Sequence, residues 1–166
     1  MLTPELENFA VSARNYCEYI ETADRYELGE RLLRGAILLA NLYSAGLFLP
    51  GQPTPADPPP PSSAPTPSAW PGFEEMTLFW QVPDAYEWGA PVITSLTDAL
   101  LSIYRDVKRG LQVFEVGYAD GDMAILQVAA WDWQHHMEQG WGNTAVDALR
   151  ALNRALWKVN NARRDF

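Results

Sequence analysis

Two stretches decide the fold: residues 95–110, which read SLTDALLSIYRDVKRG, and residues 141–153, which read WGNTAVDALRALN. In both, apolar residues recur every three or four positions, as on the buried face of an amphipathic helix. Working outward, the first stretch predicts a long helix that follows Pro91 and ends at Gly117. The second opens a last helix over residues 143 to about 162.

The same spacing predicts further helices on either side of these two. Thr3 is a good N-cap and Pro4 suits the first helical position, so a helix should begin there. A second helix is predicted over about residues 24–43. The run GAILLANLYSAGLFL, residues 35–49, is apolar on nearly every side, so it should be the most buried element or turn one face to a partner. A fourth helix, capped by Asp120, should end in a tight turn where Gly140 and Gly142 bracket Trp141.

Residues 50–71 contain ten of the thirteen prolines, four of them consecutive at residues 58–61. No helix passes through such a run, so we expect an exposed linker inside a single domain that spans residues 1–166. The aromatic segment that follows should cover the bundle, with a short helix opened by Glu74 and Glu75. Because no useful β-alternation is seen, the predicted fold class is all-α, a bundle of about five long helices with an internal proline-rich linker.

Composition and net charge argue against some classes of function. The net charge of −9 argues against a nucleic-acid binder and against adhesion to anionic membranes. The start of the chain does not read as a signal peptide, and we expect a cytoplasmic protein. The single cysteine, Cys17, falls on a helical apolar stripe and should be a buried structural thiol.

The histidines provide the first candidate site. Asp132 and His136 are four residues apart, so they share a helix face, beside His135 and the candidate Trp131. A carboxylate next to an imidazole suits acid–base work or metal binding, but two ligands do not make a site. The ordinary explanation is a polar pair on an exposed helix face.

Carboxylates provide a second candidate. Glu18, Glu21 and Asp24 are three residues apart, as in all-α nucleotide pyrophosphatases that hold magnesium on neighbouring helices. Asp98 and Asp106 are a poor second cluster, and an exposed acidic stripe is the ordinary explanation.

Polar residues of the two deciding helices are the third candidate. Tyr104 and Asp106 lie in one helix, and Asp147 and Arg150 in the other. Arg150 can pair with Asp147 on its own helix or with Asp106 across the bundle. The last helix also carries a basic stripe, which either complements the helix dipole or contacts an acidic patch, such as one on a second copy. Its members are Arg150, Arg154, Lys158, Arg163 and Arg164.

Three pieces together, NFAVSARNYCEYIE, SLTDALLSIYRDVKRGL and WGNTAVDALRALN, resemble an uncharacterised bacterial family of domains of unknown function. The resemblance implies an α-helical domain and no particular activity. It also implies a site at the matching positions Asp106, Trp141, Asp147 and Arg150. The family pattern has an acidic pair where this chain has Thr97 and Asp98, and histidines where this chain has Gly140, Thr144 and Asn153. A metal or catalytic role of those histidines would be lost here.

We assign no catalytic residue, metal ligand or cofactor from the sequence. The leading interpretation is a non-catalytic helical module that binds a protein partner or self-associates, because Tyr and Trp exceed the needs of a small core. It predicts an exposed apolar patch. The alternatives are a magnesium-dependent hydrolase of nucleotides or phosphate compounds, and an acidic inhibitor or immunity-type protein. The candidate binding residues are Asp98, Tyr104, Asp106, Trp131, His135, His136, Trp141, Asp147 and Arg150.

Overall fold

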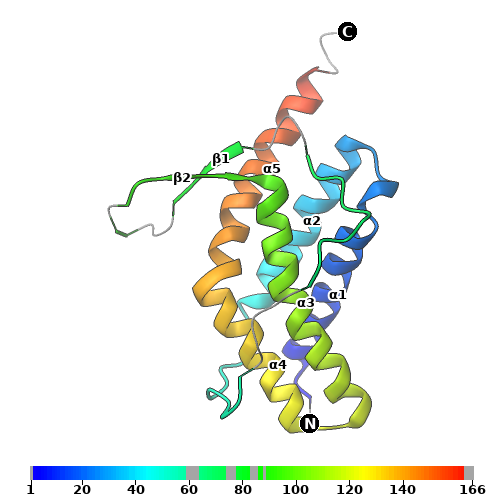
Figure 1. The fold of residues 1–166 in the computed structure, drawn as a ribbon, viewed down its shortest axis with the longest axis vertical. Coiled ribbons are helices and arrows are strands. Elements are labelled where there is room, and N and C mark those ends of the chain that lie inside the picture. The colour runs from blue at the N-terminus through cyan, green and yellow to red at the C-terminus, as the bar shows by residue number, and fades with distance from the viewer. Residues whose placement is uncertain (1, 59–63, 74–77, 83–85, 88, 163–166) are drawn as a thin grey trace.

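A computed structural model describes residues 2–58, 64–73, 78–82, 86–87 and 89–162. The helices are α1 (Pro4–Glu21), α2 (Leu28–Gly46), α3 (Leu96–Asp120), α4 (Met123–His136) and α5 (Gly142–Ala162). A 3-10 turn, Ala23–Arg25, precedes α2. The predicted all-α bundle is confirmed, and the helices run along the long axis of the molecule (Figure 1).

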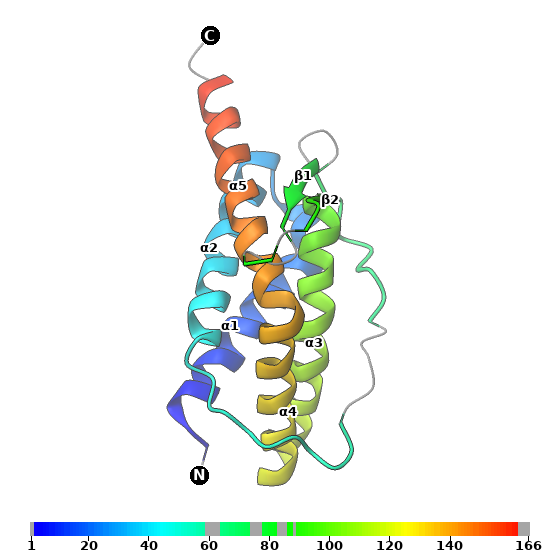
Figure 2. The same cartoon turned by 90° about the vertical axis from the view of Figure 1, so that its left-hand side faces the viewer.

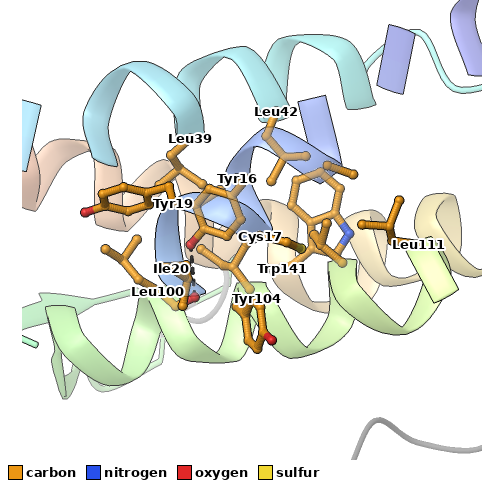
Figure 3. Packing of buried hydrophobic residues seen from close by; sticks show 14 of the residues in the cluster. Tyr16, Cys17, Tyr19, Ile20, Leu39, Leu42, Leu100, Tyr104, Leu111 and Trp141 are labelled. Atoms are coloured by element: carbon orange, nitrogen blue, oxygen red, sulfur yellow. Dashed lines mark hydrogen bonds between the residues drawn. The ribbon is translucent and has the colours of Figure 1, made fainter. Parts of the chain in front are cut away.

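Helix α2 packs between α1 and α5, while α3 packs against α1, α4 and α5. The core forms where these helices face one another (Figure 3). Tyr16 and Cys17 of α1 lie there with Leu39 of α2 and Leu100 of α3, and the Tyr16 hydroxyl donates to the Leu100 carbonyl at 2.9 Å. Burial raises the pKa of Cys17 to about 12, so the thiol is buried as predicted.

The observed helix ends match the predicted ends at some positions only. The Thr3 side chain accepts from the Leu6 amide, which confirms the first cap. Helix α3 continues past the predicted stop at Gly117, which is buried against α4. It ends at Asp120, and the next residue, Gly121, has a left-handed φ of 66° and caps the helix. Asp122, rather than Asp120, then caps α4 with two hydrogen bonds.

The predicted tight turn around Trp141 is wrong. Residues Met137–Trp141 instead form a π-helical segment (η2), so α4, η2 and α5 make one continuous helical run. The buried indole of Trp141 donates to the carbonyl of Trp133 at 3.2 Å, which holds this wider turn. Gly142 sits where a side chain would strike the Met137 carbonyl.

The expectation of no β-structure is also wrong. Strands β1 (Leu78–Gln81) and β2 (Val92–Ser95) pair antiparallel, with Trp80 opposite Ile93. Four-residue strands are too short to produce a clear alternating pattern. The aromatic segment covers the bundle only in part. Trp70 and Phe73 are buried and Phe79 packs against the core, whereas Trp80 is exposed on the hairpin, which reaches away from the bundle (Figure 1). The expected helix at Glu74 and Glu75 lies outside the described residues.

The described parts of the proline-rich segment contain no helix or strand. The chain crosses the end of the bundle after α2 and returns along the outside of α3 (Figure 2). The Gln52 amide donates to the Gln134 side chain, and Arg105 donates to Thr66. Trp70 then enters the core near Tyr19. Most of the four-proline run, residues 59–61, lies outside the described residues.

Candidate functional site

A buried ion pair joins α3 to α4. Nε of Arg109 lies 3.1 Å from each carboxylate oxygen of Asp132, and Nη2 lies 2.9 Å from Oδ1. Asp132 is fully buried and the Arg109 side chain is only 10% exposed. The expectation of an exposed Asp132–His136 pair is therefore wrong, because this face of α4 packs against α3.

Two contacts of the Trp133 indole hold α3 and α4, the helices that carry this pair, against each other. The indole of Trp133 donates to the Val107 carbonyl at 3.0 Å and lies directly over Gly110. A Cβ at Gly110 would collide with the indole nitrogen of Trp133, so only glycine permits this approach. Arg109 and Asp132 are thus fixed by neighbours one residue away on each helix.

His136 closes the ion pair toward solvent. Its Nδ1 lies 2.8 Å from the Asp132 carbonyl oxygen and 3.3 Å from Oδ1 of Asp132. Nη2 of Arg109 lies 2.8 Å from Nδ1 and 2.9 Å from Nε2 of His136, and the ring nitrogen that accepts from it is set by the tautomer. The Asp132 side chain raises the pKa of His136 above its ordinary value, although burial and the Arg109 charge oppose the shift.

Asp106 lies one helical turn before Arg109 and beside Gly140 of η2. Its side chain makes no hydrogen bond with another described residue. Burial raises the pKa of its carboxyl, while the positive charges of His136 and Arg109 lower it. On the outer side, the ring of His135 stacks on Trp131, with ring centroids 4.8 Å apart. Perturbed titratable groups beside a π-helical turn are a pattern common at functional sites.

The remaining predicted residues lie elsewhere. Asp98 and Ser95 cap the start of α3, and the Tyr104 hydroxyl donates to Glu21 of α1. Arg150 donates to Asp147 and to the Trp80 carbonyl, so it ties α5 to the hairpin. The alternative pairing of Arg150 with Asp106 is wrong, because Asp106 instead faces Arg109 and His136.

The carboxylates proposed for magnesium do not converge. Glu21 accepts from Lys108 at 2.6 Å, whereas Asp98 is used in a cap and Asp106 lies beside η2. Within the parts of the chain that are described, no three His, Cys, Asp or Glu side chains are grouped to hold a metal ion. This arrangement gives the hydrolase interpretation no geometric support.

The other feature of functional interest is an exposed surface that we call the α2 face. It consists of Leu33, Ile37, Ala40 and Ser44 of α2 and of Leu47 and Phe48 in the turn that follows the helix. All six residues are exposed, and the four large ones are 50%, 51%, 61% and 67% exposed in chain order. Between residues 33 and 48 the only charged residue is Arg34. A neutral groove of about 320 Å³ separates this face from α1, lined by residues that include Asn8, Ser12, Asn15 and Asn41.

A family model matches residues 72–158, which is just over half of the chain, and its description is "Domain of unknown function (DUF5063)". This chain belongs to the DUF5063 family. The sequence resemblance to a family of unknown function is therefore confirmed. No curated protein matches the chain.

A solved structure resembles this DUF5063 protein over its whole bundle: the crystal structure of protein BF1032 from Bacteroides fragilis. The match has a TM-score of 0.72 and 18% identity, and it covers 92% of each chain. At this identity the likeness shows the fold alone. Within the described residues, no helix combines the length and apolarity that a membrane crossing requires.

Arg109 and Asp132 form the centre of the buried cluster. The sequence indicates Asp132 only as a neighbour of His136 on an exposed helix face, and it indicates no role for Arg109. A signal for Asp132 exists in the sequence: it is the only acidic residue in α4 and stands between two tryptophans. A lone charge in an apolar helix indicates a buried, paired group. Its partner is set by the packing of α3 against α4, which helical spacing does not reveal.

Proposed function

We propose that this DUF5063 protein is a helical module that binds a protein partner through the outer face of α2. The observation that carries the proposal is a set of four large exposed apolar side chains, Leu33 and Ile37 in α2 and Leu47 and Phe48 directly after it. Single exposed apolar residues are ordinary, but these four lie at the two ends of one face, with Ala40 and Ser44 between them at three- and four-residue spacing. Exposed apolar groups gathered on one face are typical of an interaction site.

The energetics favour covering this face. Complete burial of a Leu, Ile or Phe side chain contributes about 1.5–3 kcal/mol, so four such residues at half exposure offer roughly 4 kcal/mol. The neutral groove alongside supplies amide and hydroxyl groups that can form hydrogen bonds at the margin of an interface. The absence of carboxylates on this face removes the charge desolvation that would oppose binding.

The buried cluster supports a structural role instead. Arg109 and Asp132 satisfy each other and are closed to solvent, so neither is available to a substrate. His136 is engaged by both groups. The cluster therefore holds α3, α4 and the π-helical turn in place, and the exposed apolar residues of the α2 face and of the hairpin are left open to a partner.

Affinity capture from the native host tests the proposal, with three baits: the wild type, Ile37→Glu and Ile93→Glu. The two isoleucines have matched exposures of 51% and 55%, one on α2 and one on the hairpin. We expect a specific captured protein, which can be this chain itself, with the wild type and Ile93→Glu and its loss with Ile37→Glu. Equal capture by a folded Ile37→Glu bait would contradict the proposal.

A further inference from the structure

We propose that α5 and the hairpin form a second interaction surface, which binds an acidic and partly apolar segment of another protein. We call this surface the basic face. It consists of Arg150, Arg154, Trp157 and Lys158 of α5 and of Trp80 of β1. The inference goes beyond the proposed function, because no residue of the α2 face contributes to it.

The members of the basic face lie together on the exposed side of α5. Arg154 and Lys158 follow Arg150 at four-residue intervals and Trp157 lies three residues after Arg154, so all four share one side of the helix. All four are exposed, Trp157 to 57%. Nη2 of Arg150 donates to the Trp80 carbonyl at 3.1 Å, which brings β1 against this side, and Trp80 is 59% exposed. The last turns of α5 project past the ends of the neighbouring helices (Figure 1, Figure 2).

The helix dipole does not account for these cations. Its favourable effect on cations is confined to the last turn of a helix, and the last turn of α5 has no basic residue. Arg154 and Lys158 have no ion-pair partner among the described residues, and Arg154 instead lies over the Trp157 ring, 4.6 Å from its centroid. Arg150 pairs with Asp147, yet its side chain stays 66% exposed. Two of the three positive charges are therefore not neutralised within the described part of the chain.

No acidic residue interrupts the end of α5, because residues 148–162 contain neither Asp nor Glu. In a chain whose net charge is −9, a segment that carries cations only is where an acidic partner meets the least repulsion. The other members of the basic stripe, Arg163 and Arg164, lie outside the described residues. Charge complementarity thus selects an acidic partner.

The two exposed tryptophans indicate that the partner is also apolar in part. Trp and Arg are the residue types that most often dominate the binding energy of protein interfaces. Arg154 lies over Trp157, so a cation and an apolar ring are presented at one place. A segment that combines carboxylates with Leu or Phe side chains matches both groups. Nucleic acids and anionic membranes carry dense negative charge, which the rest of this acidic chain repels.

Fluorescence anisotropy of a fluorescein-labelled helical peptide of Glu and Leu, titrated with the purified full-length protein, is the first test. We expect the wild type to bind, and to bind less tightly as salt is raised, because salt screens the opposite charges. Arg154→Glu should weaken binding about tenfold or more, since it places a like charge in the contact.

Arg14→Glu is the matched control for Arg154→Glu. It changes the net charge by the same amount at a residue of α1 whose side chain is 49% exposed. We expect it to bind the peptide as the wild type does, and circular dichroism checks that both variants are folded. No binding by the wild type, or equal losses in the two variants, would overturn the inference.

The apolar part of the contact is tested by Trp157→Ser, which leaves the charge unchanged. It should weaken peptide binding at low and at high salt, whereas Val116→Ser, at a residue of α3 that is 54% exposed, should not. Identical binding by Trp157→Ser and Val116→Ser would contradict a partly apolar partner.

Other anionic partners are tested by replacing the peptide with oligothymidylate or with vesicles that contain phosphatidylserine. We expect both to bind less tightly than the peptide. Tighter binding of either probe would overturn the acidic protein segment as the occupant. Ile37→Glu should bind the peptide as the wild type does, so failure of this inference leaves the proposed role of the α2 face to its own test.

Discussion

The Arg109–Asp132 pair and the outer face of α2 depart from the usual distribution of residues in opposite directions. At the first, two charged groups are buried between helices; at the second, four large apolar side chains are at least half exposed. The buried charges are satisfied within the chain, by each other and by His136. The exposed apolar residues have no such compensation inside the described structure, and burial against a partner would supply it.

The largest expected effect comes from removing one member of the buried pair. Asp132→Ala should reduce the free energy of unfolding by about 3–5 kcal/mol, because it leaves the Arg109 charge buried without a partner. Urea denaturation followed by circular dichroism measures this loss. As a control, Asp147→Ala removes a carboxylate whose partner Arg150 is 66% exposed, and should cost less than about 1 kcal/mol. Equal losses of unfolding free energy in the two variants would mean that the buried Arg109–Asp132 pair stabilises the fold no more than an exposed pair does.

The next largest effect is expected at the close contact of α3 with α4. Gly110→Ala places a methyl group against the Trp133 indole and displaces its hydrogen bond to Val107. Overpacking of this kind costs about 1–3 kcal/mol, measurable by the same denaturation experiment. Gly89→Ala is the matched control, since no atom lies within 4 Å of the added carbon, and its stability should be unchanged. A stable Gly110→Ala would show that the two helices can separate at no cost.

The pH dependence of stability sharpens the role assigned to His136. Its pKa in the folded chain lies above the ordinary value near 6.5, mainly because of Asp132, with Arg109 and burial opposing and Asp106 nearby. A raised pKa contributes stability that is complete below pH 6.5 and is lost as pH rises through the folded value. Unfolding free energy measured above pH 6.5 should therefore fall in the wild type, and fall less in His136→Gln. Identical pH profiles would remove His136 from the electrostatic balance of the cluster.

The smallest effect on stability is expected on the α2 face. Ile37→Glu should change the free energy of unfolding by no more than about 0.5 kcal/mol, because the side chain is half exposed in the isolated chain. Thermal unfolding of the dilute protein measures this. A loss of several kcal/mol would mean that Ile37 is needed for the fold and that the contrast between the two regions is false.

The helices were predictable because apolar spacing in α1, α3 and α5 follows the helical period closely. The π-helical turn was not predictable, because Gly140 and Gly142 are equally compatible with a tight turn. Which of the two forms depends on the hydrogen bond from the Trp141 indole to the Trp133 carbonyl. The site was only partly predictable. His136 and Asp106 could be selected as titratable residues on helix faces. Nothing in the local sequence distinguishes Arg109 from the other charged residues of α3, because its partner Asp132 lies on α4.

The α2 sequence allowed two interpretations, a fully buried helix or a helix with one face turned to a partner. Composition could not choose between them, because both require apolar residues on all sides. The structure shows that α1 and α5 cover two flanks of α2 and leave the third exposed. Expectations about the compartment and about the single domain with its internal linker remain predictions.

Photo-cross-linking in the native host tests the central claim most directly. A benzoylphenylalanine at position 37 places the reactive group on the α2 face, and the same group at position 93 places it on the hairpin. We predict a cross-linked product at position 37 only, with a mass of twice 18.6 kDa if the partner is a second copy. Absence of any product at position 37, from a variant that folds and accumulates normally, would contradict the account.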